Sequence, residues 1–126
     1  MSRQIVLVGH CNIDGPRLER EFSNKLRDTE VTRVNNDDDL ERASESNCAM
    51  LMINREPVGF DRDGLEIVRK LKESHPDLRV MLVSDYEDAQ AEAQQLGALP
   101  GFGKSEIGSD KLIRRIEDAL ETQDAK

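Results

Sequence analysis

The sequence predicts an α/β fold in which helices cover both faces of a parallel β-sheet, and three observations lead to it. Three short runs are almost wholly apolar, which is typical of strands buried on both faces of a parallel sheet. Segments with helical character follow each of these runs. Strand and helix alternate along the 126 residues, and strict alternation favours right-handed crossovers between parallel strands. The apolar runs are Gln4 to Val8, Cys48 to Ile53 and Arg79 to Val83.

The first predicted helix follows the strand Gln4 to Val8 after a polar loop. Asp14-Gly15-Pro16 indicates its start, because Asp14 is a good capping residue and proline is tolerated in the first turn. Glu30 to Val34 then alternates between polar and apolar residues and indicates a more exposed strand. The apolar face of the helix is formed at i, i+4 and i+8 by Leu18, Phe22 and Leu26.

The middle of the chain contains two further helices. Asn35 to Asp39 supplies capping residues for a short helix that continues through Leu40 and Ala43. Arg55 to Gly64 is a loop, and the helix after it stops near His75-Pro76, because a proline biases the residue before it away from helix. The apolar face of this helix is formed by Leu65, Val68 and Leu71.

The last two units carry weaker patterns. Glu87 to Leu96 is helical by composition, although its apolar face is thin, and Gly97 suits its C-terminus. Leu99 to Gly103 indicates a weak strand, and Ser109-Asp110 caps a final helix. The inward face of that helix consists of Leu112, Ile113, Ile116 and Leu120.

The strand order follows from the continuity of the apolar runs. Ile5–Val8, Met50–Ile53 and Val80–Val83 are continuously apolar, so we place them in the centre of the sheet. The strands at the edges are then Glu30–Val34 and Leu99–Gly103, and the expected order of the five parallel strands is 2-1-3-4-5. Sites in such sheets lie outside the carboxyl ends of the strands. The loops at that edge are Gly9–Gly15, Asn54–Gly64, Ser84–Tyr86 and Lys104–Ile107.

Composition narrows the classes of function. The net charge is -8, which disfavours binding to nucleic acid or to an anionic membrane, and no apolar run approaches the ~20 residues of a membrane span. We therefore expect one cytoplasmic domain over residues 1–126.

The two cysteines are expected to be free thiols. Cys11 and Cys48 should lie at opposite ends of neighbouring parallel strands, which is too far apart for a disulfide.

The order and spacing of the units resemble the receiver domain of bacterial response regulators, which has a flavodoxin-like fold. The segment from Asn54-Arg55-Glu56-Pro57 to Asp63-Gly64 is similar to the family's loop after the third strand. Val83-Ser84 is similar to the hydroxyl residue that ends the fourth strand, and Gly97-Ala98 followed by Lys104 is similar to the small pair and the lysine around the fifth. The resemblance covers nearly the whole chain.

The carboxylates of receiver chemistry are missing from this sequence. A receiver binds Mg²⁺ through an acidic pair after the first strand and a phosphoacceptor Asp after the third. Gly9 and His10 stand where the pair would be. The acceptor position, counted back from Pro57, is Ile53, or Asn54 with a shift of one residue. We therefore expect no metal, no cofactor and no phosphorylation.

The resemblance thus implies an atypical receiver, or pseudo-receiver, that is not an enzyme. The aromatic switch position is Gly101, with Phe102 one residue later, so the switch is altered. Without a phosphoryl group, Lys104 either pairs with Asp85 or faces solvent. The degenerate pocket would consist of Gly9, His10, Ile53, Asn54, Ser84 and Lys104.

Signalling by such a domain would depend on a protein partner or on a second copy of the chain. In the family, the fourth helix, fifth strand and fifth helix commonly form the partner surface. The matching segments are Glu87–Leu96, Leu99–Gly103 and Ser109–Glu121. The thin apolar face of the first of these segments predicts a helix that shifts at little cost on binding.

Other chemistry is conceivable in the loop after the first strand. Cys11 and Arg17 fit the C-x₅-R pattern of small tyrosine phosphatases, in which the cysteine is the nucleophile and the arginine binds phosphate. Asp14 would place a negative charge inside that phosphate cradle.

His10, Cys11 and Asp14 are also potential metal ligands. The simpler interpretation is a polar loop with a solvent-facing His10 and with Asp14 as the helix cap. A flavodoxin-like cofactor binder is disfavoured, because the loops lack a phosphate nest.

Overall fold

The computed structural model describes residues 3–46 and 48–124, and the strands within them form one five-stranded sheet. Neighbouring strands run parallel in the order β2-β1-β3-β4-β5. Both the order and the direction confirm the prediction, and the three continuously apolar runs occupy the centre. The strands are β1 (Arg3–Val8), β2 (Thr29–Val34), β3 (Met50–Asn54), β4 (Val80–Val83) and β5 (Leu99–Phe102).

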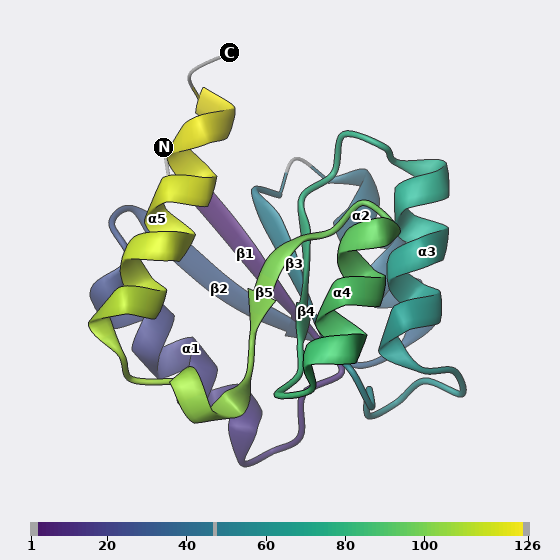
Figure 1. The fold of residues 1–126 in the computed structure, drawn as a ribbon, viewed down its shortest axis with the longest axis horizontal. Coiled ribbons are helices and arrows are strands. Elements are labelled where there is room, and N and C mark those ends of the chain that lie inside the picture. Colours follow the sequence, from purple (N-terminus) through teal and green to yellow (C-terminus); the bar gives the residue numbers. More distant parts are fainter. Residues whose placement is uncertain (1–2, 47, 125–126) are drawn as a thin grey trace.

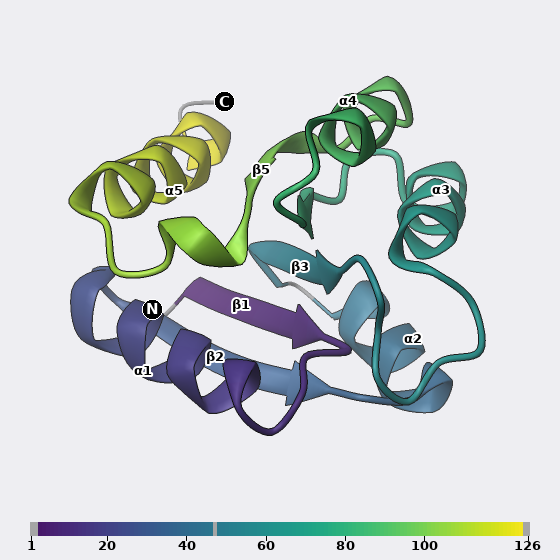
Figure 2. The same ribbon diagram turned by 60° about the horizontal axis from the view of Figure 1, so that its bottom comes forward.

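Helices cover both faces of the sheet (Figure 1; Figure 2). α1 (Asp14–Lys25) and α5 (Asp110–Asp124) lie on one face. A short 3₁₀ turn, η1 (Lys104–Glu106), precedes α5 and was not indicated by the sequence. In the part of the chain that the structure describes, no helix is long and apolar enough to cross a membrane. The other face carries α2 (Asp37–Glu45), α3 (Gly64–Ser74) and α4 (Glu87–Gln95).

The pleat of the central strands divides the core into two clusters. Along β1, Ile5 and Leu7 belong to the cluster with α1 and α5. The alternate residues Val6 and Val8 belong to the cluster with α2, α3 and α4. All four side chains are at most 3% exposed, and complete burial of such a side chain stabilises the fold by roughly 1.5–3 kcal/mol. The sheet therefore has to be covered on both sides.

The starts of the helices agree with the capping predictions except at α1. Asn36 caps α2 through its side chain, and the Ser109 hydroxyl accepts a hydrogen bond from the first turn of α5. The prediction that Asp14 caps α1 is wrong. The N-cap is Ile13, which makes no side-chain hydrogen bond, and Asp14 is the first residue of the helix. Its carboxylate is instead bound by Lys104, at 2.8 Å.

The anchoring of α4 depends on a polar side chain. Its buried apolar residues are Ala89 and Ala93, as thin a face as the sequence predicts. The Gln90 amide nitrogen, however, donates hydrogen bonds to the carbonyls of Leu82 and Ser84, and its oxygen accepts one from the Gly101 amide. The β4–β5 pairing has a register shift at this place, so Gln90 satisfies backbone groups that the ladder leaves unpaired. α4 is therefore tied to two strands, and the expectation that it shifts at little cost does not fit this geometry.

Replacing Gln90 with methionine should lower the free energy of unfolding by about 2–3 kcal/mol, because the apolar chain fills similar space but leaves buried carbonyls and an amide without partners. Urea denaturation followed by circular dichroism measures this change. The matched control is Gln95→Met on the same helix, where the side chain is exposed and the expected effect is below about 0.5 kcal/mol. Equal effects of the two substitutions would contradict the anchoring role.

Candidate functional site

A cavity of about 410 Å³ opens at the carboxyl ends of the central strands, at the lower edge of the sheet in Figure 1. In open parallel sheets, ligands bind at this edge, where the strand order reverses between β1 and β3. Four residues singled out from the sequence line the cavity: Cys11, Asn54, Ser84 and Lys104. The remaining lining residues are Arg55, Glu56, Val58, Val83, Asp85 and Tyr86.

The two candidates for the acceptor position at the end of β3 point to different places. Ile53 is fully buried in the apolar cluster beneath α2, α3 and α4. Asn54 is also buried but lines the cavity. Its amide nitrogen donates hydrogen bonds to the carbonyl oxygens of Gly9, at 3.0 Å, and Glu56, at 3.1 Å. Of the two candidates, Asn54 is thus the one that faces the cavity, and its side chain joins the loop after β1 to the loop after β3.

Gly9, in the position of the acidic pair, has no room for a side chain. Its φ is +74°, a conformation that L-residues rarely adopt. A Cβ at this position would lie 2.3 Å from the Cβ of Pro57. The Gly9 carbonyl also accepts a hydrogen bond from the Val58 amide, at 2.8 Å. A carboxylate at position 9 would therefore require the β3–α3 loop to move.

His10 is buried, so the expectation of a solvent-facing side chain is wrong. Its Nε2 lies 3.0 Å from the Met52 carbonyl oxygen, which can only accept, so Nε2 carries the proton and donates. Nδ1 is buried and has no hydrogen-bond partner among the described residues. The pKa of the imidazole is lowered from 6.5 to about 4, chiefly by burial; the hydrogen bond with the Met52 carbonyl opposes this shift, and the positive charge of Lys104 adds to it. The ring is therefore neutral at physiological pH.

Lys104 pairs with Asp14 and not with Asp85, the partner considered from the sequence. Its Nζ lies 2.8 Å from Asp14 Oδ2, and this hydrogen bond raises the pKa of the lysine and lowers that of the carboxyl group. Asp85 instead accepts a hydrogen bond from the Ser105 hydroxyl at 2.7 Å. The negative charge of Asp14 is also favourable in the first turn of α1. The ion pair connects the starts of α1 and η1 beside the cavity.

Cys11 and Arg17 do not come together as a phosphatase loop. The Cys11 thiol lies 3.5 Å from Asp14 Oδ2 and accepts a hydrogen bond from the Asp14 amide. Arg17 is exposed and lines a different pocket, together with Arg20 and Lys25. The carboxylate of Asp14 stands where a phosphate-binding cation would be needed. Within residues 3–46 and 48–124, no three His, Cys, Asp or Glu side chains lie close enough to hold a metal ion.

Both thiols are free, which confirms the prediction from the topology. Cys11 follows the carboxyl end of β1, and Cys48 precedes the amino end of β3. These ends lie at opposite edges of a parallel pair. The cysteines are therefore separated by the length of the strands.

Arg55 and Tyr86 are among the lining residues that had no role in the sequence-based site. Arg55 follows Asn54, the last residue of β3, Tyr86 lies two residues after Ser84 in the loop beyond β4, and both border the cavity. Tyr86 is 68% exposed, and its amide donates a hydrogen bond to the Ser84 hydroxyl. The indication in the sequence was their position close behind Asn54 and Ser84. They give the rim of the cavity a cationic and an aromatic side chain.

The aromatic residue of β5 is fixed in the core. Phe102 is 1% exposed and packs edge to face against Phe22 of α1, with ring centroids 6.0 Å apart. Gly101, at the expected switch position, has no side chain to move, and its carbonyl accepts a hydrogen bond from Arg115. An aromatic side chain that changes between inward and outward positions is therefore not available at residue 101.

Comparison with known proteins establishes the fold. No sequence-family model and no curated protein matches the chain. The signal receiver domain of a DNA-binding response regulator from Colwellia psychrerythraea is similar, with a TM-score of 0.80 and 18% identity over 95% of this chain and 99% of that one. An orphan response regulator of H. pylori matches with a TM-score of 0.74 and 22% identity, over 94% of this chain and 97% of that one. NtrX from Brucella abortus has a TM-score of 0.83 and 23% identity over 99% of this chain but 29% of its own. The chain has the receiver, flavodoxin-like fold.

The free energy of unfolding should fall as the pH decreases from about 6.5 towards 4, because His10 in the unfolded chain takes up a proton near pH 6.5 and the folded protein keeps the ring neutral until about pH 4. This difference in pKa corresponds to about 3 kcal/mol of stability that is complete above pH 6.5. Urea denaturation of the wild type and of His10→Gln at pH 7 and pH 4.5 isolates this contribution from that of the carboxyl groups.

His10→Gln keeps a donor for the Met52 carbonyl but does not titrate in this range, so the variant should lose less stability on acidification than the wild type by about 2 kcal/mol. His75→Gln, at the C-cap of α3, serves as the matched control and should retain the wild-type dependence. Identical pH dependence of the wild type and His10→Gln would contradict the burial argument.

Proposed function

We propose that residues 1–126 form a single receiver-like domain that acts in signal transduction by binding another protein, independently of phosphorylation and without enzymatic activity. The receiver fold and the likeness to receiver domains of response regulators support the signalling role. The chemistry at the carboxyl edge of the sheet supports the phosphorylation-independent mode.

This proposal depends on the chemistry and the hydrogen bonds of the Asn54 side chain. Formation of an acyl phosphate needs a carboxylate oxygen as nucleophile, and an amide provides none. Both protons of the Asn54 amide nitrogen are directed to backbone carbonyls, so the side chain acts as a cross-link between loops. The acceptor position therefore has a structural role in this chain.

The residues at the edge do not fit the Mg²⁺ ion that the receiver resemblance implies. Mg²⁺ prefers six oxygen ligands and needs negative charge to offset the loss of its water. Position 9 is a glycine whose carbonyl already accepts two hydrogen bonds, and position 10 is a neutral, buried imidazole. We derive no step through a metal ion.

Lys104 forms an ion pair with a carboxylate of the same chain and not with a phosphoryl group. In the receiver resemblance, this lysine is the cation available to the phosphoryl oxygens. Here the Asp14 carboxylate binds it, and the pair is only partly exposed. Unlike a phosphoryl group, this intramolecular ion pair is neither added by a kinase nor removed by a phosphatase. The domain would therefore stay in one state, and its output would depend on how much partner is present.

The proposed partner surface comprises α4, β5 and α5, as the resemblance implies. A groove of about 440 Å³ lies between α4 and the end of β5. Three carboxylates border it, those of Asp85, Glu87 and Glu106, so a partner with cationic residues fits best. A second copy of the chain is the other occupant of this surface that we consider.

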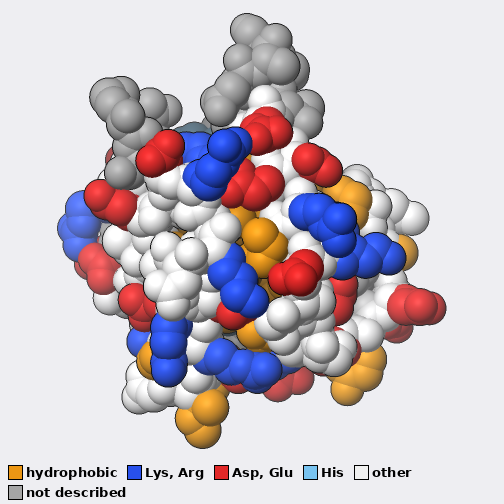
Figure 3. Space-filling view, turned by 90° about the vertical axis from the view of Figure 1, so that its left-hand side faces the viewer, with side chains coloured by type: hydrophobic (Ala, Val, Ile, Leu, Met, Phe, Trp, Pro, Cys, Tyr) orange, Lys and Arg blue, Asp and Glu red, His pale blue; other side chains and the backbone are white. Residues whose placement is uncertain are grey.

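The distribution of charge on the face formed by α1 and α5 favours a protein partner over a nucleic acid. Figure 3 shows cationic and anionic side chains interspersed over this face, around a small apolar area. Several of the cations are paired, as in Arg3 with Glu117 and Lys25 with Glu21. With a net charge of -8, a surface of mixed sign attracts phosphate backbones poorly.

Addition of Mg²⁺ and then beryllofluoride, a phosphoryl mimic, should produce no saturable NMR shifts at Gly9–Cys11, Asn54, Ser84 or Lys104. The reason is that Asn54 offers no carboxylate nucleophile and that no three potential ligands converge here among the described residues. Asn54→Asp alone should not restore the response, since position 9 still lacks a carboxylate. Saturable shifts of the wild type at these residues, or base-labile phosphate incorporated from acetyl phosphate, would overturn the proposal.

Hydrolysis of an aryl phosphate should not exceed the buffer background between pH 5 and 8. The reason is the position of Asp14 beside the Cys11 thiol and the absence of Arg17 from the same cavity. The assay uses the wild type together with Cys11→Ser and Arg17→Ala. Turnover that both substitutions abolish would establish the phosphatase alternative.

A further inference from the structure

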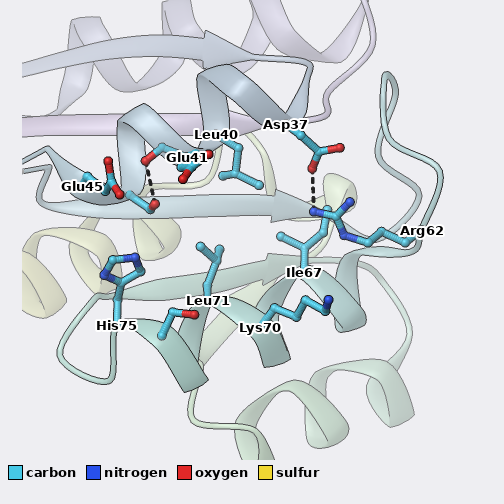
Figure 4. A pocket seen from close by; sticks show the side chains of 11 residues that line it. Asp37, Leu40, Glu41, Glu45, Arg62, Ile67, Lys70, Leu71 and His75 are labelled. Atoms are coloured by element: carbon cyan, nitrogen blue, oxygen red, sulfur yellow. Dashed lines mark hydrogen bonds and ion pairs between the residues drawn. The ribbon is translucent and has the colours of Figure 1, made fainter.

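A second groove, of about 430 Å³, lies between α2 and α3, away from the carboxyl edge (Figure 4). Its floor is apolar and narrow, formed by Leu40, Ile67 and Leu71, which are at most 8% exposed. The floor belongs to the core cluster under α2, α3 and α4, so the groove has a rigid base. The walls are formed by side chains from the two helices and from the loop before α3.

The two walls carry opposite charges. Asp37, Glu41 and Glu45 are spaced at i, i+4 and i+8 on α2 and therefore form one acidic row. Arg62 and Lys70 stand on the side of α3. Arg62 binds Asp37 at 2.6 Å and closes one end of the groove. Figure 4 shows the other charges separated across the groove.

The charged groups of the groove beyond the Arg62–Asp37 pair are unpaired. Within the described part of the chain, Glu41, Glu45 and Lys70 make no side-chain hydrogen bond or ion pair. Since these groups face an apolar floor from opposite sides, an occupant of the groove can pair with both walls at once. The groove is therefore complementary to a segment that is apolar beneath and charged on its edges.

We propose that this groove binds an amphipathic helix of a partner protein, which lays an apolar stripe on Leu40, Ile67 and Leu71 and directs Lys or Arg side chains to Glu41 and Glu45. An acidic residue on the opposite edge of that helix pairs with Lys70. This surface is separate from α4, β5 and α5, and the inference goes beyond the proposed function by naming a second binding site.

The dimensions of the groove fit a short helical contact. The acidic row spans residues 37–45, which is about 12 Å along a helix axis, or roughly two turns. Glu41 and Glu45 are one turn apart, with about 6 Å between their Cβ atoms, so they match two cations at i and i+4 of a partner helix. The unpaired carboxylates outnumber the unpaired ammonium group, and the whole chain is acidic, so both local and overall charge favour a basic helix.

The test uses a synthetic peptide of about 15 residues, a length at which an isolated helix is appreciably populated. The peptide is acetylated and amidated, with a leucine stripe, two lysines at i and i+4 on one edge and a glutamate on the other. A comparator peptide has glutamine in place of the lysines. Binding to the whole chain is followed by ¹H–¹⁵N NMR titration at low ionic strength.

The expected result is a set of saturable shifts confined to residues 37–45 and 62–75. Glu41→Gln with Glu45→Gln should raise the Kd about fivefold, because two partly exposed ion pairs are lost. The matched control, Glu30→Gln with Asp38→Asn, removes two exposed carboxylates outside the groove and should change the Kd less than about twofold.

Four outcomes would overturn the inference: no saturable binding, shifts centred on another surface, equal binding of the comparator peptide, or equal effects of the two double variants. Concentration-dependent shifts of the groove without peptide would also overturn it, in favour of a second copy as the occupant. These outcomes leave the proposed function intact, because that proposal is overturned by a response to beryllofluoride, which the groove variants do not alter.

Discussion

The close contact between the end of β1 and the loop after β3 shapes the carboxyl edge of the sheet. Gly9 and Pro57 approach so closely that a side chain at position 9 would collide with the proline ring. The same contact directs the Gly9 carbonyl to the Val58 amide and to the side chain of Asn54. Between β1 and β3, the carboxyl edge of the sheet is thus joined by neutral backbone and amide groups. In a fold whose sites lie at this edge, the contact removes the place where acidic side chains would converge.

Several charged groups near this edge are already engaged by other groups of the same chain. Lys104 is bound by Asp14, and Asp85 is occupied by Ser105. His10 is held neutral by burial, with its one proton committed to the Met52 carbonyl. A phosphoryl group that approached Lys104 would have to displace Asp14, and a cation that approached Asp14 would have to displace Lys104. This arrangement agrees with the proposal that the outer surfaces of the domain bind a partner.

The helices that form those surfaces are held in place by two different kinds of interaction. α2 and α3 are held by apolar side chains on the central strands, and the groove between them has a buried apolar floor. α4 has little apolar surface to bury and is held by the hydrogen bonds of Gln90 to the backbone of β4 and β5. Hydrogen bonds are directional, whereas apolar contacts tolerate some sliding. Both arrangements give a partner a surface of defined shape, and neither requires a change at the carboxyl edge.

The sequence by itself determined the alternation of strands and helices, the parallel order of the sheet and the two free thiols, because these follow from local periodicity and from the continuity of the apolar runs. It also named Asn54, Ser84 and Lys104, which the structure brings to one cavity. It could not choose between Ile53 and Asn54, since a shift of one residue in a strand reverses the face. The partners of Lys104, the burial of His10 and the anchoring by Gln90 were decided by the tertiary structure alone, because each joins side chains or backbone groups from separate elements whose spacing only the folded chain sets.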